Sequence, residues 1–362
     1  MRTPTQSSPL VSQSTDSDPS HLPLEVRRHP LVGHVEKQLV WRCGLKGSPD
    51  HPQPLIIGIS GGADSVALLL ACSVIASRQS CVALITPIAV HVHHHLRDSA
   101  DDDATWVADL CLRLGVVCHV EHVQPGEMPG NVAANARKLR YEAMANVAKR
   151  EQANFIAVAH HGDDQLETMI MALGRGTGLE GFSGMPWTRP MEGHESIHLV
   201  RPLLDSRHHE CESLCRAGGI VWREDPGNLD PSSARARVRH EIAPVMERLW
   251  PDAARRVTAT GDLVAAAGIA LEKMLGDIFG EVSQRSWVRG ELKGLAPAII
   301  SAGLRRAALD CAPQVADEIG QKHLGQAAEA IADEEVRPRS FDWPGGIVLC
   351  VTSRQVEMKP GG

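Results

Sequence analysis

The chain has 362 residues, 43% of them apolar and 22% charged, so it is long enough for two domains and has the composition of a globular protein. Its net charge of −7 excludes a chain that is basic throughout, and its aromatic content of 3% argues against a base-stacking surface. A nucleic-acid partner would therefore have to be bound by local basic patches. The nine cysteines show no regular spacing, which favours free thiols in a reducing compartment.

The N-terminal segment, residues 1–24, is rich in Ser, Pro, Thr and Gln, which predicts a disordered tail. It lacks the apolar stretch of a signal peptide, and no later stretch is long enough to span a bilayer. We therefore expect a cytoplasmic protein.

The first motif is the segment SGGADS at residues 60–65, which lies between an apolar run at 55–59 and a second one at 66–71. The order strand, glycine turn, helix directs backbone N–H groups and a helix N-terminus at a phosphate group. Gly61 and Gly62 let the backbone approach an anion, and Asp64 could hold Mg²⁺ on the phosphates. No lysine follows the glycines, so this is not the GxxxxGK[ST] loop. Taken alone, the motif is also compatible with a glycine-rich turn that binds nothing.

Strands and helices alternate after this motif. The apolar patterns predict strands at 84–92, 116–120 and 155–159, and helices at 99–114, 131–150 and 163–173. Repeated βα units indicate the α/β class, with a doubly wound parallel sheet and ligands at the carboxyl ends of its strands. Helical patterns at 253–275, 296–309 and 323–332, then a hairpin within 340–352, predict a smaller, mainly helical second domain.

The strand at 84–92 leads into the histidine-rich segment HVHHHLR, residues 91–97. A zinc site is one interpretation, but catalytic zinc requires convergent ligands at established spacings. We favour a strand-end loop whose imidazoles and Arg97 face the nucleotide or the substrate. Both interpretations stay open on the sequence alone.

Two further segments carry charge in patterns typical of function. Asp163 and Asp164 are adjacent acids at a strand-to-helix junction, where they could bind Mg²⁺ or cap the helix. The densest basic patch is RARVR at 235–239, whose alternate arginines suit contacts with phosphates. A solvated helix face is the alternative for this patch, and also for Arg137 and Arg140 in the predicted helix at 131–150.

Taken in order, these segments resemble the motifs of tRNA(Ile)-lysidine synthetases, which are members of the PP-loop ATP-pyrophosphatase superfamily. SGGADS is similar to SGGxDS, HVHHHLR to HVNHGLR, residues 131–141 to NxEAxARxxRY, and residues 160–168 to HHxDDQxET. Residues 201–210, 222–230 and 235–239 are similar to RPLLxxxRxE, WxxDxSNxD and RNxxR. The departures of the chain from these motifs include His93, His95, Ala133, Gly227 and Ala236. Since the relatives have Asn and Gly at the first two positions, those histidines cannot be required by the shared chemistry.

The resemblance implies an adenine nucleotide α-hydrolase-like fold, with a catalytic domain at 25–250 and a substrate-binding domain with a terminal hairpin at 251–362. It implies that ATP and Mg²⁺ are used to join free lysine to C2 of the wobble cytidine of a tRNA(Ile) with a CAU anticodon. The reaction would pass through an adenylated cytidine and give AMP and pyrophosphate.

The resemblance also assigns roles to individual residues. The catalytic groups would be Asp64, Asp163, Asp164, Arg175, His94 and His161, with the three aspartates as Mg²⁺ ligands. The ATP-binding residues would be Ser60, Gly61, Gly62, Ala63, Asp64, Ser65 and Arg97. The contacts with tRNA would be Arg137, Arg140, Arg235, Arg237 and Arg239.

Two other classes of protein remain as alternatives. A PP-loop adenylating enzyme of the tRNA thiolase type would need paired cysteines, and the sequence contains no CxxC. A non-catalytic tRNA- or nucleotide-binding relative is compatible with the departures at Ala133 and Ala236, and the intact SGGADS and HHGDDQLET segments argue against it.

Overall fold

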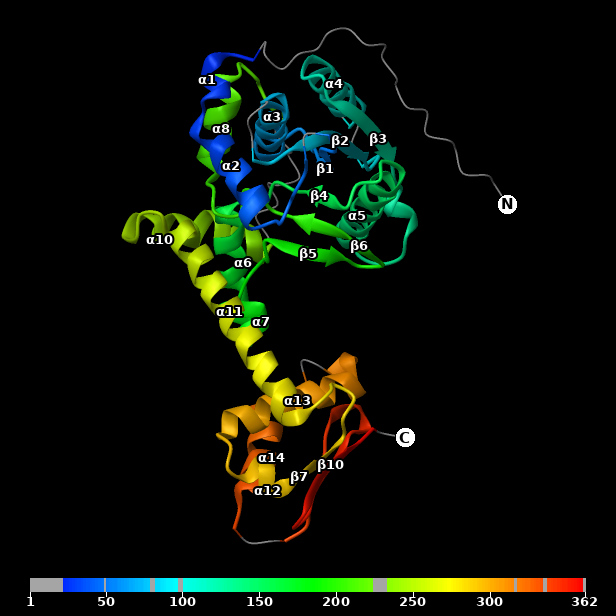
Figure 1. The fold of residues 1–362 in the computed structure, drawn as a ribbon, viewed down its shortest axis with the longest axis vertical. Helices are drawn as coiled ribbons and strands as arrows, with labels where there is room; N and C mark the ends of the chain where they lie inside the picture. Colours follow the sequence, from blue (N-terminus) through cyan, green and yellow to red (C-terminus); the bar gives the residue numbers. More distant parts are fainter. Residues whose placement is uncertain are drawn as a thin grey trace, which may run out of the picture. The chain divides into compact units, whose positions relative to one another are not determined.

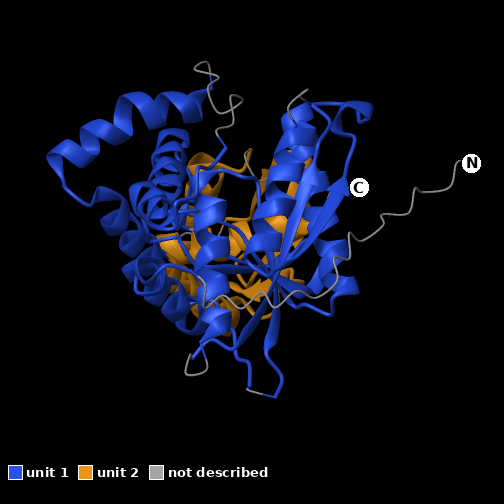
Figure 2. Ribbon diagram, turned by 90° about the horizontal axis from the view of Figure 1, so that it is seen from above, with its two compact units in different colours: residues 1–264 blue, residues 265–362 orange. Residues whose placement is uncertain are grey.

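The computed structural model describes residues 22–48, 50–78, 82–96, 100–223, 233–315, 318–334 and 337–360. The chain forms two compact units, residues 1–264 and 265–362, shown in two colours in Figure 2. The boundary between them falls inside helix α11 (Ala253–Phe279), and the predicted domain division at residue 250 stays a prediction. Most of the predicted tail, Arg97 and the loop at 224–230 lie outside the described residues.

The first unit is built on a six-stranded sheet with the strand order β3-β2-β1-β4-β6-β5 (Figure 1). The strands are β1 (Gln53–Gly58), β2 (Ile85–His93), β3 (Val117–His122), β4 (Phe155–Ala157), β5 (Thr188–Met191) and β6 (His194–Val200). Only the edge strand β5 pairs antiparallel, with β6. The predicted doubly wound parallel sheet is therefore confirmed. The chain adds strands outward from β1 to β3 and then returns to the other side of β1, so β1 and β4 flank the switch point where such sheets bind ligands.

Both faces of this sheet are covered. Leu55 and Ile57 pack with α2 (Pro30–Trp41), α3 (Ala63–Ser77), α4 (Ala100–Arg113) and α8 (His208–Ala217). Ile56 packs on the opposite face with α5 (Val132–Arg150). Because neighbouring residues of β1 are buried on opposite faces, the strand has a continuous apolar sequence instead of an alternating one.

Besides the helices named above and α11, the first unit contains one further long helix, α6, and several short ones. They are α1 (Leu24–Arg27), α6 (Gly162–Arg175), α7 (Leu179–Phe182), α9 (Ala234–Arg237) and α10 (Ala243–Leu249), with a π-helical turn at Val238–Ile242 and a 3₁₀ turn at Pro125–Glu127. No helix in the described part of the chain is long and apolar enough to cross a membrane. The cysteines that the structure describes are free thiols.

The second unit combines helices with a small antiparallel sheet. Its helices are the C-terminal part of α11, α12 (Arg289–Lys293), α13 (Pro297–Cys311) and α14 (Gln321–Ala332). Its sheet has the order β7-β10-β9-β8, from strands β7 (Ser286–Val288), β8 (Arg339–Asp342), β9 (Val348–Val351) and β10 (Gln355–Lys359). The predicted terminal hairpin corresponds to β8 and β9, and the prediction missed the two strands that extend it into a sheet. Leu304, Ile331 and Leu349 are among the fully buried residues that join the helices to this sheet.

Candidate active site

The SGGADS segment forms the turn between β1 and α3, as predicted. Gly61 has φ +95°, a conformation that favours glycine, and its carbonyl accepts the backbone N–H of Arg223 at 2.9 Å. The hydroxyl of Ser65 accepts the N–H of Ser60 at 3.1 Å and donates to the carbonyl of Gly62 at 2.9 Å. Gly62 is the N-cap of α3, so Ala63 and Asp64 lie in its first turn. These bonds fix the turn and leave the helix N-terminus directed at the carboxyl edge of the sheet, where an anion is favoured.

A second helix, α6, begins at the same edge of the sheet, after β4. Its N-cap is His161, whose backbone N–H donates to Oδ2 of Asp164 at 3.1 Å, in a capping box. The backbone N–H of Gly162 donates to the carbonyl of Ser206 at 2.7 Å. A Cβ at position 162 would lie 2.9 Å from that same oxygen, so a glycine is needed where α6 meets the chain before α8.

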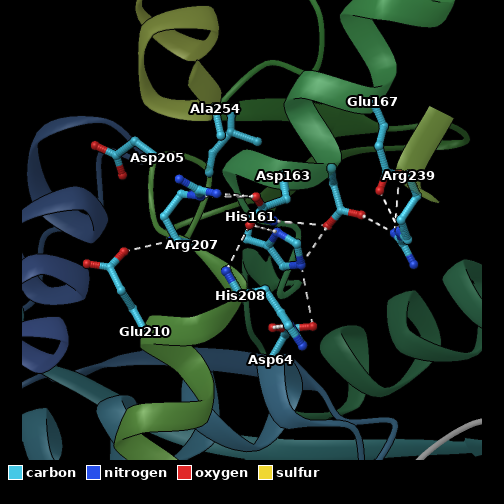
Figure 3. A network of polar contacts seen from close by, with 12 residues as sticks. Asp64, His161, Asp163, Glu167, Asp205, Arg207, His208, Glu210, Arg239 and Ala254 are labelled. Atoms are coloured by element: carbon cyan, nitrogen blue, oxygen red, sulfur yellow. Dashed lines mark hydrogen bonds and ion pairs between the residues drawn. The ribbon is translucent and has the colours of Figure 1, made fainter. Parts of the chain in front are cut away.

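The centre of the site is the imidazole of His161, which is buried among three carboxylates (Figure 3). Its Nε2 lies 3.5 Å from Oδ2 of Asp64 and 3.5 Å from Oδ2 of Asp164, and its Nδ1 lies 3.4 Å from Oδ2 of Asp163. The fold thus brings together four of the predicted catalytic residues, which come from α3 and from the start of α6.

These contacts set the protonation states of the cluster. Burial acts to lower the pKa of His161, but the negative charges of Asp164, Asp163 and Asp64 raise it well above its ordinary value. Burial acts to raise the pKa of Asp64, but hydrogen bonds from His161 and His208 hold it well below its usual range. His161 is therefore held as an imidazolium between ionised aspartates.

His208, the first residue of α8, is the fifth member of the cluster, and the sequence analysis missed it. Its Nδ1 lies 2.8 Å from Oδ1 of Asp64, and its backbone N–H donates to Oδ2 of Asp163 at 2.9 Å. The hydrogen bond with Asp64 raises the pKa of His208. The one available signal was its place in the segment that resembles RPLLxxxRxE, next to Arg207.

The carboxylates of Asp163 and Asp164 are held by arginines. Asp163 accepts from Nε of Arg207 at 3.0 Å, and Asp164 lies 3.4 Å from Nη2 of Arg235 and 3.3 Å from Nη2 of Arg239. Among the described residues, Asp64 forms ion pairs with two histidines and none with an arginine. Mg²⁺ is usually held by one or two carboxylates, with phosphates and waters supplying the other ligands. Asp64 is therefore the member of the cluster that best fits a Mg²⁺ ligand.

The predicted basic patch at 235–239 divides between two environments. Arg235 and Arg239 point to α6 and bind Glu167, whose side chain is only 2% exposed, with Nε–Oε distances of 2.8 Å and 2.5 Å. Arg237 is exposed and pairs with Glu241 at 3.1 Å. Arg235 and Arg239 therefore stabilise the packing of their helix on α6, a role that the spacing of the arginines in the sequence did not indicate.

Arg175 is not brought into the cluster. It is the last residue of α6, followed by Gly176 in a left-handed conformation with φ +71°. Asp164 lies in the first turn of the same helix, so the helical rise separates the two residues by about 17 Å along the axis. The predicted contact of Arg175 with phosphates stays a prediction.

A second group of arginines surrounds the ring of Tyr141 on α5. The guanidinium carbons of Arg137 and Arg140 lie 5.1 Å and 5.5 Å from the ring centroid, and that of Arg189 on β5 lies at 5.7 Å. Among the described residues, no carboxylate forms an ion pair with these three arginines. Converging guanidinium groups without a carboxylate partner suit an anion such as a phosphate. The sequence analysis found two of the three and missed Arg189, which is far away in the sequence.

The histidine-rich segment occupies the end of β2. The ring of His91 is buried, with Nδ1 3.0 Å from the carbonyl of Ile59, next to the SGGADS turn. His94 follows the last residue of β2 and is half-buried. His93 and His95 instead face His122 on β3.

The comparisons with known proteins agree with this fold. Residues 37–246 match the PP-loop domain family, which defines the first unit as a PP-loop ATP-binding domain. The fold is also similar to that of the U34-tRNA thiolase from Methanococcus maripaludis with its [4Fe-4S] cluster. That likeness has a TM-score of 0.52 at 18% identity and covers 67% of this chain and 78% of the thiolase.

The most similar relatives include three proteins named tRNA(Ile)-lysidine synthase. The one from Salinispora arenicola is 37% identical, over 75% of this chain and 79% of the relative. The one from Salinispora tropica is 33% identical, over 92% of this chain and 98% of the relative. The one from Deinococcus radiodurans is 32% identical over 87% of this chain, which spans about half, 49%, of that longer relative. The chain belongs to the tRNA(Ile)-lysidine synthase family.

Proposed function

We propose that this chain uses ATP to join free lysine to C2 of the wobble cytidine of a tRNA(Ile) with a CAU anticodon, which gives lysidine. The proposal is supported by the family and by one observation of the structure. The N-termini of α3, α6 and α8 meet at the switch point of the sheet, where Asp64 lies within ion-pair distance of both His161 and His208. Three helix N-termini around a glycine turn favour the binding of a polyphosphate.

In the family chemistry, the 2-carbonyl oxygen of the cytidine attacks the α phosphate of ATP, and pyrophosphate leaves. The amine of lysine then attacks C2, and AMP leaves. We assign the backbone N–H groups of the turn at residues 60–65 to the leaving pyrophosphate. A Mg²⁺ ion held by Asp64 would neutralise charge on the phosphates. Asp163 and Asp164 keep His161 charged, so that its imidazolium adds positive charge at the same place.

The deprotonation of the lysine amine needs a base. Of the two histidines that the sequence suggested, His161 is held in its protonated form by the carboxylates around it. We therefore assign this role to His94, at the end of β2, because imidazole is the side chain best suited to take up a proton near neutral pH.

We assign the binding of the tRNA backbone to the arginines around Tyr141 and to Arg237. Arg137, Arg140 and Arg189 converge without a carboxylate partner among the described residues, and Arg237 lies on the exposed side of its helix. Phosphate contacts of this kind position a nucleic acid without reading its sequence. A reaction on free tRNA and free lysine places the protein in the cytoplasm.

Release of pyrophosphate in the presence of ATP and the tRNA tests the first step. Asp64→Ala should reduce it to background with the fold retained, because the side chain contributes little packing. The control is Asp102→Ala, which removes an exposed carboxylate from the first turn of α4. Release at the wild-type rate in the Asp64 variant would refute the role of this residue.

A further inference from the structure

Three histidine side chains meet where β2 and β3 end. One ring nitrogen from each of His93, His95 and His122 lies within 4.8 Å of the other two. The ring centroids of His93 and His95 are 4.0 Å apart, and each of these rings lies 5.0 Å from that of His122. Imidazole nitrogens that converge in this way are typical ligands of zinc, copper and nickel, whereas Mg²⁺ prefers oxygen.

The distances fit one small ion. Nε2 of His95 lies 2.9 Å from Nδ1 of His122. Two nitrogens on a tetrahedral zinc ion, each with a bond of about 2.0 Å, lie roughly 3.3 Å apart, so a shift of about 0.4 Å would admit the ion.

The third imidazole lies next to an exposed carboxylate. Nε2 of the buried His93 lies 2.9 Å from Oδ1 of Asp101, in the first turn of α4. The other nitrogen, Nδ1 of His93, lies on the side of His95 and accepts a hydrogen bond from the backbone N–H of that residue at 3.3 Å, a bond that an ion at this nitrogen would replace. A carboxylate on the other ring nitrogen is the usual arrangement for a histidine that binds a metal, because it fixes the ring and raises its basicity.

Two of the three histidines depart from the motif HVNHGLR, which has Asn and Gly at these positions. His95 has φ +52°, in the left-handed region that is uncommon for a residue with a Cβ. The loop thus keeps a backbone conformation that glycine would adopt freely, yet it carries an imidazole directed at His122. A bond from that imidazole to a ligand would give a physical reason for the substitution.

We propose that His93, His95 and His122 bind one Zn²⁺ ion, with water as the fourth ligand and Asp101 as the carboxylate that orients His93. The ion would join the ends of β2 and β3 to the first turn of α4, three elements that lie next to one another in Figure 1. The site is open on one side, because His95 and His122 are exposed. It is separate from the carboxylate cluster around Asp64, and it does not depend on the proposed function.

The test is a titration of the metal-free full chain with Zn²⁺ in excess Mg²⁺, followed by calorimetry and elemental analysis. We expect one tightly bound equivalent in the wild type. His93→Asn combined with His95→Gly should weaken this binding by more than about 100-fold, and Asp101→Asn by about 10- to 100-fold. The matched control is His119→Asn on β3, whose imidazole faces Glu151 at 3.0 Å, and it should bind zinc like the wild type.

Each other outcome overturns the proposal. A wild type without a stoichiometric equivalent has no such site. An equivalent that persists in the double variant lies elsewhere, for example at Asp64, His161 and His208, which also offer converging ligands. If the double variant does not fold, His122→Asn takes its place, because His122 is exposed and lies on another strand. The His122→Asn variant must then lose the bound equivalent of zinc. The double variant should keep its release of pyrophosphate, which separates this site from the catalytic cluster.

Discussion

Glu167 on α6 allows a quantitative test of the interpretation of the basic segment. Its side chain is 2% exposed and is neutralised by two arginines. Arg239 contacts both of its oxygens, at 2.5 Å and 3.2 Å, and Arg235 contacts one, at 2.8 Å. Replacing either arginine with Ala leaves one cation on the buried carboxylate. Replacing both leaves none.

The expected losses of stability follow from the number of arginines that each variant leaves beside Glu167. Each arginine is about 40% exposed, with values of 43% and 40%, so solvent screens part of its interaction. We expect Arg235→Ala to lower the free energy of unfolding by about 1 kcal/mol and Arg239→Ala to lower it by about 2 kcal/mol. Both values lie within the range for a buried polar group that loses a partner. The double variant should cost about 4–5 kcal/mol, because a buried charge without a partner is strongly destabilising. The loss in the double variant should therefore exceed the sum of the single losses by at least about 1 kcal/mol.

Urea denaturation, followed through the midpoint of the transition of the first unit, measures these differences. Adding Glu167→Leu to the double variant should recover part of the lost stability, because it removes the buried charge that has no partner, while Asp164 still lacks its two arginines. The contrary result would be a loss in the double variant that equals the sum of the two single losses within about 0.5 kcal/mol, with no stability restored by Glu167→Leu. In that case the two arginines do not act on Glu167, and the assignment of their side chains to the protein interior fails.

The remaining predictions concern the pair of His208 with Asp64, the arginines around Tyr141, and His94. The pKa of His208 is raised in the folded protein, so without Mg²⁺ its pair with Asp64 stabilises the fold fully below pH 6.5, and this contribution is lost as the pH rises through the folded-state pKa. The pKa of Asp64 is lowered, so the contribution of its carboxylate is present above pH 3.8 and is lost in stronger acid. The difference in melting temperature between the wild type and His208→Ala should thus shrink above pH 6.5, and a difference that grows with pH would contradict the pairing. Arg137→Ala and Arg140→Ala should each weaken tRNA binding and reduce its salt slope by about one unit or less, and an unchanged slope would exclude phosphate contacts. His94→Ala should impair lysidine formation but not pyrophosphate release, and equal loss of both steps would refute a role restricted to the lysine amine.

The parts of the fold that sequence predicts best are those with local signals. The strands at 53–58 and 85–93 have continuous apolar sequences because both of their faces are buried, and the glycine turn that follows the first is short and local. The hairpin of β5 and β6 was not predicted, because its residues at 188–196 resemble a loop, and burial is limited to Met191 and the end of β6.

The catalytic cluster was predicted in part, for a related reason. Asp64 and His161 belong to segments that carry recognisable local patterns, whereas His208 lies 144 residues from Asp64 and has no such pattern of its own. The spacing of Arg235 and Arg239 indicated a surface that binds phosphates, but their partner is a buried glutamate of α6, about 70 residues earlier in the chain, at separations of 68 and 72. Contacts between residues so far apart depend on the tertiary fold, and a sequence without an alignment does not record them.

The most direct test of the proposed function is mass spectrometry of the nucleosides from a tRNA(Ile) with a CAU anticodon, after incubation with the protein, ATP, Mg²⁺ and lysine. The account predicts lysidine in place of the wobble cytidine, with one AMP and one pyrophosphate for each lysine that is joined. It also predicts that Asp64→Ala forms none. An unmodified cytidine in the presence of the folded protein and all substrates would contradict it.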